Sequence, residues 1–181
     1  MGNTAVIYKS IYGTTEKYAE IISRKLGARL INLKTEKKIN LDEFDTVIFG
    51  GGIYAGDVNG VKSFFSGREK LINKNIIIFT CGISTPDTRA ESVNSAVKKA
   101  LPDSLKNKAV IFNLGGVLDY GKLGFVHRSM LSLLMRGLRS KPEAELDDTG
   151  KRLLGLRTEK ADLFDEASAD RIIEYVKSLK Q

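Results

Sequence analysis

The chain has 181 residues, 42% of them hydrophobic and 28% charged, which is the composition of a globular domain able to bury its own core. Lys and Arg (29) outnumber Asp and Glu (22), so the formal net charge is +7 and anionic partners such as phosphates, anionic lipid or carboxylated ligands are expected. One cysteine (Cys81) and one histidine (His127) exclude an intrachain disulfide and the usual zinc sites. Neither a signal peptide nor an apolar membrane span is visible, so we expect a single cytoplasmic domain covering residues 1–181.

Short apolar runs alternate with helical patterns along the chain. The runs expected to form strands are 4–9, 28–33, 46–51, 75–80 and 109–114. The helical patterns follow at 18–26, 61–71, 86–100 and 169–179, with Gly27 expected to end the first. This alternation predicts an α/β protein with a doubly wound parallel sheet. About fifty residues after the fifth strand exceed an ordinary connection and predict a helical insertion at about 117–164.

The loop after the first strand is rich in hydroxyl groups. Hydroxyls occur at Ser10, Tyr12, Thr14 and Thr15, Gly13 allows a turn, and no charged residue interrupts the segment. In an open parallel sheet, ligands bind beyond the carboxyl ends of the strands, and a helix N-terminus attracts anions. These residues therefore predict a neutral phosphate site, although taken alone they also fit an ordinary helix N-cap.

The loops after the third and fourth strands would lie at the same edge of the sheet. Three glycines at 50–52 allow close approach to a planar ring, on which Tyr54 could stack. The Gly-x-Gly-x-x-Ala pattern at 50–55 does not follow the first strand or open a helix directly, which argues against a dinucleotide site. The acidic residues of a phosphorylated receiver domain are absent as well. We expect Cys81 to act as a small buried apolar residue rather than a reactive thiol.

Ser10, Gly13 and Thr15 match the Ser/Thr-x-Thr-Gly-x-Thr loop with which flavodoxins bind the phosphate of FMN, whereas Tyr12 and Thr14 depart from it. The chain thus resembles the flavodoxin-like family. The resemblance implies a five-stranded parallel sheet of order 2-1-3-4-5 and FMN as the cofactor. We expect neither a metal nor a nucleic acid as ligand. The residues that it places around FMN are Ser10, Ile11, Tyr12, Gly13, Thr14, Thr15, Gly52, Ile53, Tyr54, Cys81, Gly82, Ile83, Gly116, Leu118 and Tyr120.

The insertion contains an amphipathic and strongly basic helix. A helical period places Val126, Met130, Leu133, Leu134 and Leu138 on one side and Arg128, Ser132, Arg136 and Arg139 on the other. No Asp or Glu occurs between Asp119 and Glu143. Such a helix suits the interface of an anionic membrane, which residues 122–141 would contact at the inner face of the cell membrane. The alternative is that its apolar side packs on its own domain.

The segment Gly116-Val117-Leu118-Asp119-Tyr120, followed by this helix, resembles the flavodoxin-type, menaquinone-dependent protoporphyrinogen oxidases. This resemblance implies an oxidoreductase that passes electrons from a porphyrinogen-like substrate to a quinone. Two alternatives stay open: an electron carrier that docks on a redox partner protein, and a nucleotide-binding module without redox activity. The basic charge, with Lys9 and Lys122 near the expected site, predicts a reduction potential above that of ordinary flavodoxins. We expect His127 to be a flank residue half in contact with the core.

Overall fold

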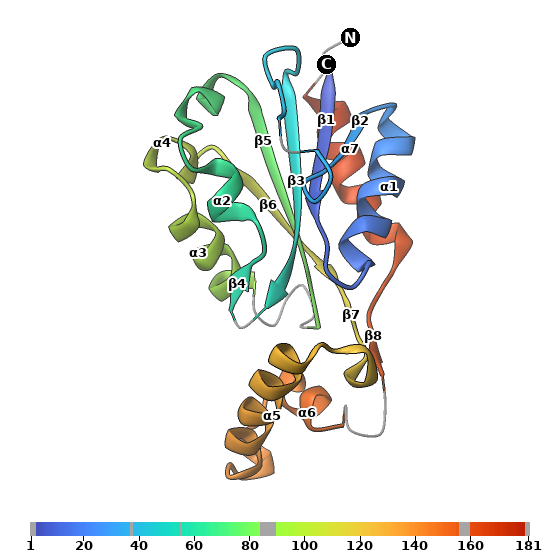
Figure 1. The fold of residues 1–181 in the computed structure, drawn as a ribbon, viewed down its shortest axis with the longest axis vertical. Coiled ribbons are helices and arrows are strands. Elements are labelled where there is room, and N and C mark those ends of the chain that lie inside the picture. The colour runs from blue at the N-terminus through green and yellow to red at the C-terminus, as the bar shows by residue number, and fades with distance from the viewer. Residues whose placement is uncertain (1–2, 37, 55, 84–89, 156–159, 180–181) are drawn as a thin grey trace.

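A parallel sheet runs through the middle of the molecule (Figure 1). The computed structural model describes residues 3–36, 38–54, 56–83, 90–155 and 160–179. The strands are β1 (Thr4–Lys9), β2 (Arg29–Asn32), β3 (Thr46–Tyr54), β4 (Asp57–Val58), β5 (Asn75–Gly82) and β6 (Val110–Gly115). Their order is β2-β1-β3-β5-β6, and the short β4 pairs antiparallel with the end of β3. Once β4 is set aside, this is the predicted α/β architecture with the predicted strand order.

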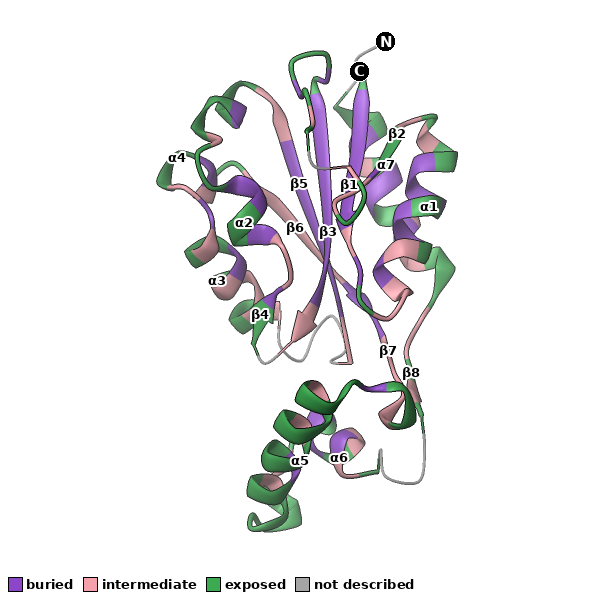
Figure 2. Ribbon diagram, in the orientation of Figure 1, coloured by how far each residue is buried: buried purple, intermediate pink, exposed green. Residues whose placement is uncertain are grey.

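The central strands form because their residues are apolar on both faces. Along β1, Ala5 and Ile7 join one buried cluster, and Val6 and Tyr8 join the other. This alternation is the two-residue period of a strand, and it divides the core into two layers. β3 is fully buried from Thr46 to Gly52, as expected for a strand covered by helices on both sides (Figure 2).

Helices cover both faces of the sheet. One face carries α1 (Thr14–Leu26) and α7 (Asp170–Ser178), preceded by η4 (Glu166–Ala169); the other carries α2 (Val61–Phe65), η1 (Glu69–Asn73), α3 (Ala90–Ala100) and α4 (Asp103–Lys106). The predicted helix at 61–71 is wrong in its second half. Gly67 has a left-handed φ of 71°, which breaks the helix, and a 3-10 turn follows. The predicted start of the next helix at Pro86 lies outside the described residues.

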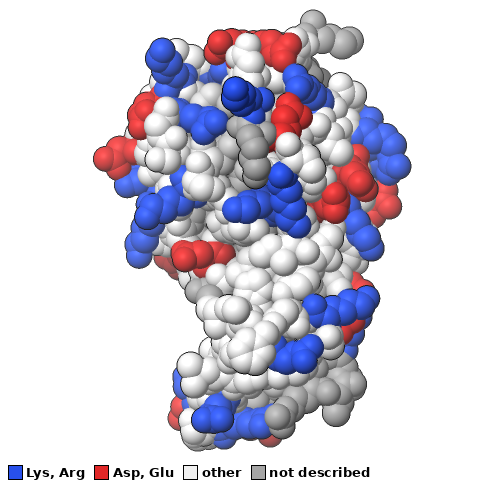
Figure 3. All heavy atoms as spheres, viewed as in Figure 1, with Lys and Arg blue, Asp and Glu red and all other residues white. Residues whose placement is uncertain are grey.

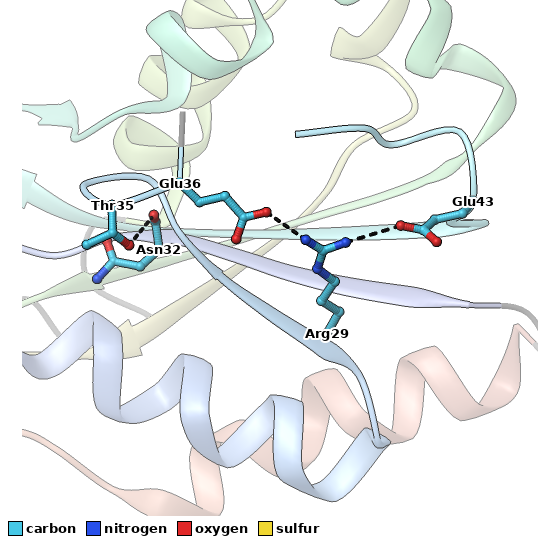
Figure 4. A network of polar contacts seen from close by, with 5 residues as sticks. All are labelled: Arg29, Asn32, Thr35, Glu36 and Glu43. Atoms are coloured by element: carbon cyan, nitrogen blue, oxygen red, sulfur yellow. Dashed lines mark hydrogen bonds and ion pairs between the residues drawn. The ribbon is translucent and has the colours of Figure 1, made fainter. Parts of the chain in front are cut away.

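Between β2 and β3 the chain makes an excursion that polar contacts hold against the sheet (Figure 4). The Arg29 guanidinium lies 2.7 Å from the Glu36 carboxylate and 3.2 Å from that of Glu43. The Thr35 hydroxyl donates to the Asn32 carbonyl at the start of the turn. Because these groups are exposed, they fix the path of the segment more than they stabilise the fold.

The residues after β6 form a separate cluster of short elements beyond the carboxyl ends of the strands (Figure 1). They are β7 (Val117–Leu118), η2 (Tyr120–Lys122), α5 (Phe125–Arg139), η3 (Glu143–Glu145), α6 (Asp148–Gly155) and β8 (Ala161–Asp162). β7 and β8 pair antiparallel and bring the two ends of the insertion together. The Tyr18 hydroxyl also connects the two ends of the insertion. It donates a hydrogen bond to the Gly115 carbonyl and accepts one from the Asp165 N–H, both at 3.0 Å.

Most of the apolar side of α5 is exposed in the part of the molecule that the structure describes. Of the five apolar residues expected on one face, four are exposed, and Leu138 is half-buried (Figure 2). The helix packs instead through Met135, which is buried, and through Leu138, which lies beside Gly150 of α6. Among the residues that the structure describes, no helix is long and apolar enough to cross a membrane.

Candidate functional site

The loop between β1 and α1 carries no charged side chain and leads directly into a helix N-terminus. Gly13 caps α1 with a left-handed φ of 95°, and its N–H donates to the Ser10 hydroxyl at 3.0 Å. A side chain there would be strained although no atom obstructs it, which explains the glycine. The first intrahelical hydrogen bond runs from the Lys17 N–H to the Gly13 carbonyl. The preceding N–H groups therefore lack intrahelical acceptors and favour an anion.

The ends of β3 and β5 lie next to this loop. The parallel register pairs Lys9 with Gly51 and Gly52 with Cys81, so the three strands end at one edge of the sheet. A methyl group added to Gly82 would lie 2.8 Å from the Ile53 side chain, so glycine permits the close approach. Gly116 joins this edge because its N–H donates to the Gly82 carbonyl at 2.6 Å.

Cys81 is a buried, protonated thiol. It is 5% exposed, and burial raises its pKa to about 12, against a smaller lowering by a hydrogen bond from the Thr15 side chain. A thiol with that pKa is neutral near pH 7 and is a poor nucleophile. Its contact with Thr15 links the β1–α1 loop to the end of β5.

Two tyrosines and the histidine form an aromatic cluster over the loop. The rings of Tyr54 and His127 are stacked, with centroids 5.1 Å apart and planes at 8°. The Tyr12 hydroxyl forms a 2.6 Å hydrogen bond with His127 Nδ1 and accepts one from the Gly124 N–H at 3.3 Å. Burial, followed by the nearby Tyr12 and Cys81, raises the pKa of Tyr54 to about 12. The cluster attaches the N-terminus of α5 to the site.

His127 is therefore a site residue that the sequence analysis missed. It is half-buried, as expected of a flank residue, but its ring contacts Tyr12 and Tyr54 rather than only the core. The helical pattern of 125–139 defines which residues share a face, yet it says nothing about which distant loop the helix meets. The one signal available in the sequence was that the only histidine lies on the basic helix.

The remaining predicted site residues lie less centrally. Ile11 is 41% exposed, and the Ile83 carbonyl accepts a 3.4 Å hydrogen bond from Arg152 of α6. Leu118 belongs to β7. Tyr120 faces α5, because its hydroxyl lies 2.8 Å from the Ser132 hydroxyl and Arg128 lies over its ring.

The two lysines expected near the site differ in their surroundings. Lys9 is half-buried and lies beside Gly60. The Lys122 side chain is 81% exposed and lies 3.8 Å from the Asp119 carboxylate, so part of its charge is already matched. Of the two, only Lys9 belongs to the strand that leads directly into the β1–α1 loop.

The donor set suits a phosphorylated planar cofactor. Hydroxyl and amide donors at the start of α1 fit a phosphate, and the aromatic and apolar groups of the β3 and β5 ends fit a flat ring. Within the described ranges, no group of three or more His, Cys, Asp or Glu side chains is placed to hold a metal ion.

Several known proteins are similar to this chain. An uncharacterized protein of Methanocaldococcus jannaschii is 34% identical over 107 residues, which cover 57% of this chain and 65% of that protein. The oxidised flavodoxin 2 of Bacillus cereus is 18% identical with a TM-score of 0.46, covering 62% of this chain and 85% of its own. A flavoprotein of Lactobacillus acidophilus, solved in complex with FMN, is 13% identical with a TM-score of 0.44. The match covers 64% of this chain and 93% of that protein's chain.

A family model provides the assignment. The model described as the flavodoxin domain matches residues 5–145, which is more than half of the 181-residue chain. The match includes the parallel sheet except for Thr4, the β1–α1 loop and α5. The chain belongs to the flavodoxin domain family.

Proposed function

We propose that this protein binds FMN and uses it in a redox reaction. The observation that carries the proposal is the neutral hydroxyl and amide loop at the start of α1, next to Tyr54, in a chain of the flavodoxin domain family. Ser10, Thr14 and Thr15, with the N–H groups of the first turn, would hold the phosphate. The residues that would border the ring are Ile11, Tyr12, Gly52, Ile53, Tyr54, Cys81, Gly82, Ile83 and Gly116.

When bound, FMN would supply electron or hydride transfer, and the protein positions it and adjusts its potential. The net charge of +7 favours the more negatively charged reduced cofactor. We therefore expect a two-electron potential above that of ordinary flavodoxins. Potentiometry of the FMN-loaded protein measures this directly, and a potential as low as theirs would refute the expectation.

For the reaction itself, we propose electron transfer from a large, apolar, carboxylated substrate of the porphyrinogen type to a quinone. The support is the 116–120 sequence pattern and the exposed apolar face of α5, which Arg128, Arg136 and Arg139 flank. The second candidate is an electron carrier that docks on an acidic protein through the same basic helix. Leu118 of β7 and Tyr120 of η2 would also border the cofactor from the insertion.

One pair of assays tests these proposals. Flavin absorbance of the purified protein, identified as FMN after release, tests cofactor binding. Turnover of protoporphyrinogen with a menaquinone analogue then separates the two redox roles. Turnover supports the oxidoreductase, whereas reduction by a flavodoxin reductase without substrate turnover supports the carrier. A protein that neither contains nor takes up FMN would contradict both.

A further inference from the structure

The outer side of α5 exposes a continuous apolar stripe. We call the set Phe125, Val126, Met130, Leu133 and Leu134 the α5 stripe; their exposed fractions are 85%, 66%, 47%, 69% and 51%. Val126, Met130, Leu133 and Leu134 recur at three- and four-residue spacing and so follow the helix along one side, and Phe125 extends the stripe at the first residue of the helix. Single exposed apolar residues are common on proteins, but a contiguous group of this kind marks an interaction surface.

Arginine side chains flank the α5 stripe, and no acidic residue near them in the sequence balances their charge. Arg128, Arg136 and Arg139 lie on α5, and no acidic residue occurs between Asp119 and Glu143. In the part of the chain that the structure describes, no ion pair joins these arginines to a carboxylate. Figure 3 shows more basic than acidic side chains over the end of the molecule that α5 and α6 form. A partner that matches both the α5 stripe and these arginines must therefore present a surface that is apolar and anionic.

A groove beside the α5 stripe is lined by both apolar and basic side chains. It lies between η2 and α5, has a volume of about 410 Å³, and is lined by Phe125, Leu133, Arg128 and Arg136 among others. One Arg128 nitrogen donates to the Gly121 carbonyl at 2.9 Å, which holds this guanidinium over the Tyr120 ring. Guanidinium groups bind phosphate oxygens with several donors at once. The groove thus places phosphate-binding groups next to apolar side chains.

We propose that the α5 stripe and this groove dock the protein on an anionic lipid membrane. The apolar side chains would enter the headgroup region, and Arg128 and Arg136 would bind lipid phosphates. A second copy of the chain is a poor occupant, because two identical basic faces would repel each other. An acidic protein would need cavities matched to the protruding side chains, whereas a bilayer accepts them without matching.

The location of α5 gives the docking a functional consequence, which rests on the proposed FMN binding. Gly124 and His127, at the N-terminus of α5, contact Tyr12 and Tyr54 of the candidate site. α5 and α6 lie at one end of the long axis of the molecule (Figure 1). A docked α5 therefore holds the candidate site near the bilayer, where a lipid-dissolved quinone is concentrated.

Vesicle flotation tests the docking itself. The full chain, with and without FMN, is mixed with vesicles of phosphatidylcholine alone or of phosphatidylcholine with phosphatidylglycerol. We expect retention on the anionic vesicles only, and a decrease of about tenfold or more in partitioning for Phe125→Ser/Leu133→Ser and for Arg128→Gln/Arg136→Gln. Ile72→Ser, an exposed apolar residue elsewhere, and Lys70→Gln, a basic one, are the matched controls and should bind like the wild type.

Because the changed residues are exposed, we expect each variant to remain folded, and circular dichroism checks this. Failure of the wild-type protein to float with anionic vesicles at low salt would overturn the docking proposal. So would wild-type binding by Phe125→Ser/Leu133→Ser, because the apolar contact would then have no part. Retention by a polyglutamate matrix without vesicle binding would assign the face to an acidic protein instead. Because the assay needs no FMN, a failure of cofactor binding leaves its result readable.

Discussion

Tyr18 illustrates how a single hydroxyl group connects the insertion to the sheet. Its side chain is fully buried, and the hydroxyl bonds both the Gly115 carbonyl before β7 and the Asp165 N–H after β8. In Tyr18→Phe these two groups lose a partner, which we expect to lower the free energy of unfolding by about 1–3 kcal/mol. Urea unfolding measures the change. Tyr175→Phe is the control, and equal losses in both variants would contradict this role.

Buried acids with raised pKa values predict a loss of stability in alkali. Burial raises the pKa of Tyr18 from 10.0 to about 12 and that of Cys81 from 9.0 to about 12. Both groups stay protonated in the folded protein at a pH where the unfolded chain has released its protons. Their contribution to the free energy of unfolding is therefore complete below pH 9, and it is lost progressively as the pH rises toward about 12. Urea midpoints that stay constant between pH 9 and pH 11 would be inconsistent with these shifts.

At the residue scale, the sequence indicated the donor groups but not all of their neighbours. Ser10, Gly13 and Thr15 were identifiable because hydroxyls and a glycine before a helix have a known use. The contact of Tyr12 with His127 was not, because it joins residues 115 positions apart. Only the docking of α5 onto the β1–α1 loop brings them together.

At the element scale, the aromatic cluster predicts how firmly α5 is held. In His127→Ala, the stacking with Tyr54 and the hydrogen bond with Tyr12 are both lost. An aromatic pair contributes about 0.5–1.5 kcal/mol, so we expect amide hydrogen exchange in the first turns of α5 to accelerate roughly three- to tenfold. Exchange in α1 should remain unchanged. Met130→Ala, at an exposed position on the same helix, is the control, and equal acceleration by both variants would argue against the anchor.

The elements that the sequence predicted well are those with long apolar patterns. All five strand runs were found: β1, β3 and β5 are almost wholly buried, and the less buried outer strands β2 and β6 still carry short apolar runs. The two-residue strands β7 and β8 were missed, since so short a pairing depends on contacts across the whole insertion. The exposure of the apolar residues of α5 was also undecidable, because a helical pattern defines a face without stating what covers it.

At the scale of the whole molecule, the basic charge, the insertion and the sheet edge form one arrangement. The flavodoxin topology places the β1–α1 loop and the ends of β3 and β5 together, and the insertion places α5 beside them. The sequence resemblance was sufficient for the strand order and for the family, because both depend on the pattern of the entire chain. The substrate depends on a few groups around the site, and its assignment therefore requires the turnover assay.

The most direct test of the central claim compares the affinities of FMN and riboflavin for the cofactor-free protein. These ligands differ only in the phosphate, so their ratio isolates the contribution of the loop at residues 10–15. We predict that FMN binds about 100-fold more tightly or better, because hydrogen bonds to a charged group contribute about 1.5–3 kcal/mol each. Ser10→Ala should reduce this ratio about tenfold, and Ser178→Ala should not. Equal binding of FMN and riboflavin, or binding of neither, would contradict the account.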